Sequence, residues 1–154
     1  MNVEIPYSPR PLQTELHDAL DAHRFAVVVT HRRFGKTVLA INHLLRAAVI
    51  CELPNPRFAY LSPTYRQSKA VAFDYLKSFA GAIPGAKFHE TELRCDLPNG
   101  ARISLLGAEN PASLEGRRSG PFSYLLVILD QGFRFARLWA SRWDWPFISR
   151  MWTW

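Results

Sequence analysis

The segment Thr30-His31-Arg32-Arg33-Phe34-Gly35-Lys36-Thr37 decides the fold predicted for this chain. It follows the apolar run at residues 25–29, and a segment with apolar residues at helical spacing begins directly after it. A buried strand, a tight loop ending in Gly-Lys-Thr and a helix form the layout of a phosphate-binding loop. In that layout, N–H groups of the loop and of the helix N-terminus surround an anionic phosphate. Thr30 stands where the usual motif has its first glycine.

Three residues of this loop carry the expected chemistry. Gly35 allows close approach of the backbone to a phosphate, Lys36 supplies a mobile positive charge, and the Thr37 hydroxyl is placed to bind Mg²⁺. The alternative is an ordinary strand-to-helix turn with a surface lysine, but turn chemistry alone does not call for Lys-Thr after the glycine. We therefore expect ATP and Mg²⁺ as cofactors.

The composition is that of one basic domain with a hydrophobic core. The chain has 154 residues, of which 48% are hydrophobic, and a formal net charge of +6 at pH 7. The charge favours an anionic partner, either nucleic acid or nucleotide, over an inert basic surface. The two cysteines are far apart and the histidines show no metal-binding spacing, so we expect a reduced cytoplasmic protein without a structural metal.

Signals for export and for membrane insertion are both missing from the sequence. The N-terminus has no basic segment followed by an apolar one, so we expect no signal peptide. No apolar run approaches the roughly 18 residues that a membrane span needs.

Expected helices and strands alternate along the chain. Apolar spacing predicts helices over 12–22, 37–51 and 65–82, strands over 25–29, 57–61 and 124–129, and a hairpin of 87–97 with 101–106. Asn99-Gly100 is the expected hairpin turn. The alternation indicates an α/β fold, a P-loop NTPase-like parallel sheet flanked by helices. We predict a partial ATPase domain over 1–130 and an irregular tail over 131–154, which holds all five tryptophans.

The order of these motifs resembles the N-terminal ATPase domain of the terminase large subunit of tailed phages, the DNA-packaging motor. Residues 31–37 look like the arginine-rich phosphate loop of that family, and residues 60–69 look like the segment after its second strand. Residues 97–101, 107–111 and 114–116 resemble the hairpin and loop that precede its acidic motif. The resemblance covers roughly residues 5 to 116.

The resemblance implies a set of nucleotide-binding residues. Gln13 stands where such motors carry an adenine-reading glutamine, and Arg32 or Arg33 would stabilise charge on the γ-phosphate. The full implied set is Gln13, Arg32, Arg33, Phe34, Gly35, Lys36 and Thr37. The resemblance also implies double-stranded DNA as a partner, with the terminase small subunit and the portal in an intact relative, in the bacterial cytoplasm.

Catalysis depends on the end of the last apolar strand. By resemblance, Lys36, Arg33 and Asp130 are the catalytic residues, and Asp130 holds Mg²⁺ together with Thr37. The family has glutamate after this aspartate, but here Gln131 follows, and an uncharged amide cannot accept a proton from water. The acidic residues of a C-terminal nuclease domain are also missing. We therefore expect impaired hydrolysis and a truncated or frameshifted prophage fragment.

Two other readings stay open from the sequence. The basic charge and Gln131 suit a non-catalytic nucleic-acid-binding remnant. A Gly-Lys-Thr loop also occurs in other P-loop enzymes, such as a helicase-like ATPase or a small kinase.

Overall fold

The computed structural model describes residues 4–23, 26, 28, 30–31, 33–107, 109 and 124–127, the last four by their backbone alone. Helices and a mixed sheet make up these residues, which confirms the α/β class. The elements are α1 (Pro11–Ala22), α2 (Lys36–Ile50), β1 (Arg57–Ser62), α3 (Tyr65–Gln67), the π-helical turn η1 (Ser68–Ala72), α4 (Phe73–Ala80), β2 (Lys87–His89), β3 (Arg94–Asp96), β4 (Arg102–Gly107) and β5 (Tyr124–Val127).

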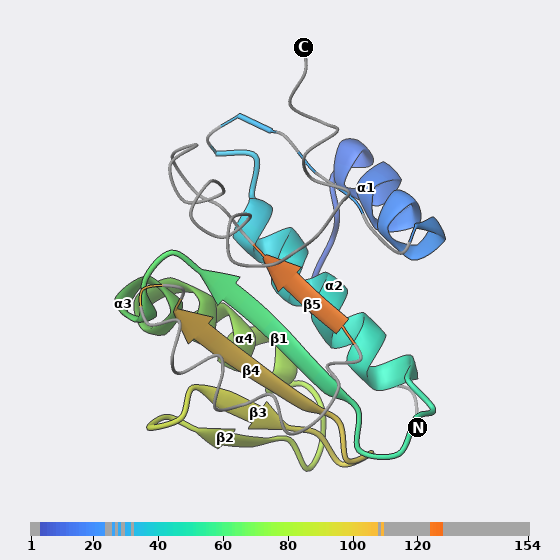
Figure 1. The fold of residues 1–154 in the computed structure, drawn as a ribbon. Helices are drawn as coiled ribbons and strands as arrows, with labels where there is room; N and C mark the ends of the chain where they lie inside the picture. The colour runs from blue at the N-terminus through green and yellow to red at the C-terminus, as the bar shows by residue number, and fades with distance from the viewer. Residues whose placement is uncertain are drawn as a thin grey trace, which may run out of the picture.

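The five strands form one sheet in the order β2-β3-β4-β1-β5 (Figure 1). β1 pairs parallel with β4 on one side and with β5 on the other, whereas β3 pairs antiparallel with both β2 and β4. The sheet is therefore mixed: β4, β1 and β5 form its parallel part, and the predicted hairpin supplies the antiparallel part, with the strand predicted over 87–97 divided into β2 and β3. The physical reason is the short connection between β3 and β4, because a tight turn can only join antiparallel neighbours.

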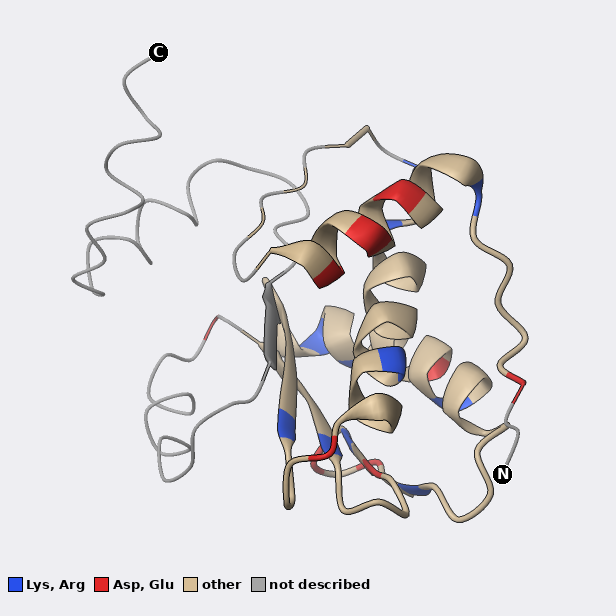
Figure 2. Cartoon of the chain, turned by 90° about the vertical axis from the view of Figure 1, so that its right-hand side faces the viewer, with Lys and Arg blue, Asp and Glu red and all other residues tan. Residues whose placement is uncertain are grey.

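The helices lie on one side of the sheet in the part of the chain that the structure describes (Figure 2). α2 and α4 pack against the strands, and their side chains form a core with those of β1, β3 and β4. Ile41, Leu44, Leu76 and Ile103 are fully buried there. Each such side chain stabilises the fold by about 1.5–3 kcal/mol through removal of apolar surface from water. α1 lies outside this layer, against α2.

The hairpin turn has the chemistry that its sequence predicts. Leu97 N–H donates to the carbonyl of Ala101 at 2.8 Å, and Gly100 takes a φ of 83°, which glycine adopts without strain. Asn99 Nδ2 donates to the carbonyl of Ala48 at 2.8 Å. This bond ties the turn to the last part of α2 and satisfies a carbonyl that has no partner within the helix.

The predicted helix over 65–82 is present as one continuous helical segment from α3 through η1 to α4. Thr64 caps it, since its side-chain oxygen accepts from the Gln67 N–H at 3.2 Å. The π-helical turn was not expected from the apolar spacing. It holds Ser68, whose Oγ donates to the carbonyl of Leu106 at 3.1 Å and so joins the helix to the end of β4.

The apolar run at residues 25–29 gives the clearest disagreement with the sequence prediction. Ala26 and Val28, the residues of this run that the structure describes, belong to no strand. β5 confirms the first four residues of the strand predicted over 124–129. The rest of that strand, including Asp130, and the predicted tail over 131–154 lie outside the described residues. Within the described chain, no helix has the length and apolarity to cross a membrane.

Candidate functional site

The predicted phosphate loop leads directly into α2, and its backbone has an unusual shape. Gly35 is the N-cap of α2 with a φ of 89°, and Arg33 also has a positive φ, of 65°. The first bond of the helix runs from Leu39 N–H to the carbonyl of Gly35 at 3.0 Å. The N–H groups before Leu39 therefore have no acceptor inside the helix and point out of its N-terminus. The first turn contains no acidic residue, so its positive end keeps its attraction for an anion.

Lys36 bends back over this loop. Its Nζ donates to the carbonyl of His31 at 3.3 Å, which closes the segment between the two residues into a ring. The side chain is half-buried, as is that of Thr37 beside it. Arg33 is exposed, and Arg32 lies outside the described residues. Lys36 and Thr37 are thus the first two residues of α2.

Phe34 holds the loop in place through its side chain. The ring is 7% exposed and packs with Leu20 of α1 and Leu39 of α2, and Val28 lies against the same cluster. The resemblance placed Phe34 among nucleotide-binding residues, but its ring is buried on the protein side. Any contact of Phe34 with a ligand would use its backbone.

The side chain of Gln13 also holds Phe34, through a hydrogen bond to the Phe34 backbone. The Gln13 side chain is 3% exposed, and its Nε2 donates to the carbonyl of Phe34 at 3.1 Å. Its Oε1 accepts from the N–H of Arg10, the N-cap of α1, at 3.0 Å. Both ends of the amide are engaged, so in this structure Gln13 links α1 to the loop.

Arg10 joins the site although the sequence analysis did not select it. A Cβ built on Gly35 would lie 3.0 Å from Gln13 Nε2 and 3.5 Å from a guanidinium nitrogen of Arg10. Glycine is therefore required twice at position 35, for its positive φ and for this close approach. The only sequence signal for Arg10 is its place three residues before Gln13, the spacing of an N-cap and its N3 residue.

The carboxyl ends of β1, β4 and β5 lie at one edge of the sheet, because these strands are parallel. Polar contacts gather where β1 and β4 end. Glu109 Oε1 accepts from the N–H of Tyr65 at 3.0 Å, and Gly107 packs directly against the Tyr65 backbone. Asp130 follows β5 by three residues, so its predicted place at this edge falls outside the described residues.

The described part of the site fits the phosphate half of a magnesium–nucleotide complex. N–H groups without an acceptor inside the helix, a glycine with positive φ at its start, and a lysine bent over the loop suit an anionic oxygen. The metal half has the Thr37 hydroxyl alone among described residues. No group of three or more His, Cys, Asp or Glu side chains suited to a metal occurs in the described chain.

Comparison of the chain with known protein families, with curated proteins and with solved structures found no match.

Proposed function

We propose that this chain is the ATP-binding part of a DNA-packaging motor of the terminase type, with a P-loop NTPase core. In an intact relative, such a domain couples ATP hydrolysis to the translocation of double-stranded DNA. The observation that carries the proposal is the loop at α2. Gly35 caps the helix with positive φ, and Lys36 Nζ donates to the carbonyl of His31 in the preceding loop.

The phosphates of the nucleotide would replace a weak internal contact. The bond from Lys36 Nζ to the carbonyl of His31 is long, at 3.3 Å, and its acceptor is uncharged. Hydrogen bonds between charged partners are roughly twice as strong as neutral ones. A phosphate oxygen above Gly35 would also accept from the N–H groups that open α2. The proposal therefore requires the Lys36 side chain to exchange the His31 carbonyl for a phosphate oxygen.

Thr37 and Asp130 would hold the Mg²⁺ of the nucleotide, and Arg33 would lie near its terminal phosphate. The bound metal supplies neutralisation of the phosphate charge. Gln131 stands where the resemblance puts the residue that orients the attacking water, and an amide cannot take up its proton. The proposal is therefore a binding function with little or no turnover in the chain as it stands.

The proposed partner is double-stranded DNA, with the small terminase subunit and the portal in an intact relative. The net charge of +6 supports an anionic partner. Lysine and arginine side chains would contact phosphates of the duplex, and such binding weakens with added salt. The proposed location is the cytoplasm of a bacterial host.

The test is calorimetric titration of Mg-ADP into the full chain and into Lys36→Ala. Loss of a charge-assisted contact of about 1.5–3 kcal/mol predicts at least roughly tenfold weaker binding. Lys87→Ala is the matched control, because Lys87 is exposed on β2, at the far end of the sheet from β5. Circular dichroism of each variant shows that the fold is kept. Equal affinity of wild type and Lys36→Ala would remove Lys36 from the site.

A further inference from the structure

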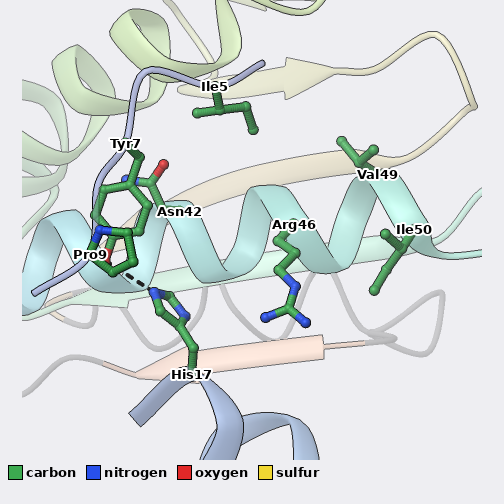
Figure 3. A pocket seen from close by; sticks show the side chains of 8 residues that line it. All are labelled: Ile5, Tyr7, Pro9, His17, Asn42, Arg46, Val49 and Ile50. Atoms are coloured by element: carbon green, nitrogen blue, oxygen red, sulfur yellow. Dashed lines mark hydrogen bonds between the residues drawn. The ribbon is translucent and has the colours of Figure 1, made fainter. Parts of the chain in front are cut away.

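A chain of polar side chains joins the N-terminal segment, α1 and α2. Tyr7 Oη lies 3.0 Å from His17 Nε2, and His17 Nδ1 lies 3.0 Å from His43 Nδ1. The two imidazole rings stack with centroids 5.3 Å apart and planes inclined by 22°. His17 is 7% exposed and His43 1% exposed. Figure 3 shows His17 rising from α1 toward Tyr7 beside the face of α2.

The contact between His17 and His43, here called the histidine pair, can form only with a limited number of protons. At 3.0 Å one Nδ1 must donate its hydrogen and the other must offer a lone pair. Tyr7 completes a consistent order, in which its hydroxyl donates to His17 Nε2 and His17 Nδ1–H donates to His43 Nδ1. The reverse order is equally consistent. If both rings are protonated, both Nδ1 atoms carry hydrogen and the bond is lost.

Charged groups around the histidine pair come from both helices. From α1, Asp21 Oδ1 lies 3.9 Å from His43 Nε2. From α2, Arg46 makes an ion pair of 2.9 Å with the other oxygen of Asp21. The Asp21 carboxylate is therefore already paired with a permanent cation, which reduces the stabilisation that it gives to a positive charge on the imidazoles.

Burial is the largest influence on both histidines, and it lowers the pKa of each ring. The positive charge of Arg46 is the second cause of the lowered pKa of His17, and the neighbouring His17 is the second cause for His43. The negative charge of Asp21 acts in the opposite direction on both pKa values. The negative charge of Asp18 also acts to raise the pKa of His17.

Two further groups complete the surroundings. The pKa of Tyr7 is raised by burial, against the positive charge of Arg10, so its hydroxyl keeps its proton. β5 contacts α2, and Tyr124 is the titratable residue within that strand. A cavity of about 360 Å³ reaches the His17 ring between Tyr7, Asn42 and Arg46 and provides a path for water and protons (Figure 3).

We propose that the histidine pair is a proton-sensitive link that holds α1 against α2 and opens when a second imidazole is protonated. His17 lies one helical turn after Gln13 on α1, and Gln13 holds the carbonyl of Phe34 in the loop. Opening of the link would therefore loosen the loop at α2. The link itself requires no nucleotide, whereas its effect on nucleotide affinity rests on the proposed function.

The direction of the pH effect follows from the lowered pKa values. The unfolded chain has ordinary histidines, with a pKa of 6.5, and below that value it binds more protons than the folded chain. The contribution of the link to stability is complete above pH 6.5 and is lost as the pH falls through and below it.

The experiment compares the full chain with His43→Gln, whose side chain can donate or accept and does not titrate. We expect the melting temperature of the wild type to fall between about pH 7.5 and pH 5.5, and that of His43→Gln to fall by less than half as much. His23→Gln is the matched control, because His23 is exposed and contacts only its own helix, at the carbonyl of Ala19. It should behave as the wild type. Parallel losses in wild type and His43→Gln would overturn the proposal.

A second measurement needs no substitution at the pair. Nitrogen chemical shifts of labelled histidines report the protonation of each ring nitrogen. We expect His17 and His43 to stay neutral below pH 6.5, the ordinary histidine pKa, with one Nδ1 of the pair carrying a hydrogen. Protonation of both rings of the pair at or above that pH would overturn the proposal. Titration of Mg-ADP at both pH values tests whether the histidine pair affects nucleotide affinity. Absence of binding at both pH values would count against the proposed function. The histidine pair itself is then tested by the melting temperatures and the nitrogen chemical shifts.

Discussion

Replacement of Gln13 by leucine tests whether α1 holds the loop. Leucine has a similar length and fills the same buried space, so the change mainly removes two hydrogen bonds. The Phe34 carbonyl loses a donor at 3.1 Å, and the Arg10 N–H loses an acceptor at 3.0 Å. The site is 3% exposed, which limits replacement of these partners by water.

The magnitude follows from the two bonds. Each contributes about 0.5–1.5 kcal/mol net, and a buried polar group left without a partner costs about 1–3 kcal/mol. For Gln13→Leu we expect a loss of about 2–4 kcal/mol in the free energy of unfolding. Gln13→Glu separates the two bonds, because a carboxylate still accepts from Arg10 N–H but cannot donate to Phe34. It should lose the contact to the loop and keep the cap of α1.

The assay is urea unfolding followed by circular dichroism at the helix band. With a denaturant slope of about 2 kcal/mol per molar, the middle of the usual range for urea, the expected loss moves the midpoint by roughly 1–2 M. Thr14→Ala is the control, because Thr14 is exposed on the same helix and its one side-chain contact is long, at 3.4 Å. A midpoint for Gln13→Leu that coincides with that of Thr14→Ala would refute the role given to Gln13.

Two further predictions concern the sheet. Gly107→Ala should destabilise the chain by about 1–3 kcal/mol or more in the same assay, since its Cβ would lie 2.4 Å from the backbone nitrogen of Tyr65. A loss under about 0.5 kcal/mol, which is the range of a surface substitution, would contradict this close packing of Gly107 against Tyr65. Cys95 should resist alkylation in the folded chain, because burial, with a smaller effect of Asp96, raises the pKa of its thiol to about 12. Mass spectrometry should find label on the half-buried Cys51 first, and equal labelling without denaturant would be inconsistent with the buried place of Cys95.

Local patterns predicted local structure well. The Asn99-Gly100 turn, the helix start at residue 65 and the start of α2 within one residue all depend on neighbours in sequence. The tertiary part of the same features was not predictable. Nothing in the sequence shows that Asn99 reaches the carbonyl of Ala48, because that bond depends on how the hairpin and α2 pack.

The contact between His17 and His43 could not be predicted from the sequence, for a similar reason. His17 and His43 are 26 residues apart on different helices, with no spacing that a motif would register. Each alone looks like a polar residue on an amphipathic helix. Their contact follows from the packing of α1 on α2, and only the structure supplies that.

The apolar run at residues 25–29 shows where periodicity fails. A short apolar run suits a buried strand, but it suits any other buried segment equally well. Ala26 and Val28 form no strand, and Val28 packs against the cluster of Leu20, Phe34 and Leu39 instead. Ala26 is exposed and Val28 is half-buried, so for these two residues the apolar composition predicted neither the strand nor full burial.

This outcome changes how the loop at α2 is supported. In the predicted layout, a sheet strand would lead into the loop and fix one end of it. In the described structure the fixed points are the buried Phe34 ring and the Gln13 bond, and both depend on α1. Among the described residues, the loop is therefore held through contacts with α1 as well as with α2. Substitutions in α1, well outside the Gly-Lys-Thr motif, should consequently affect the loop as strongly as substitutions within it.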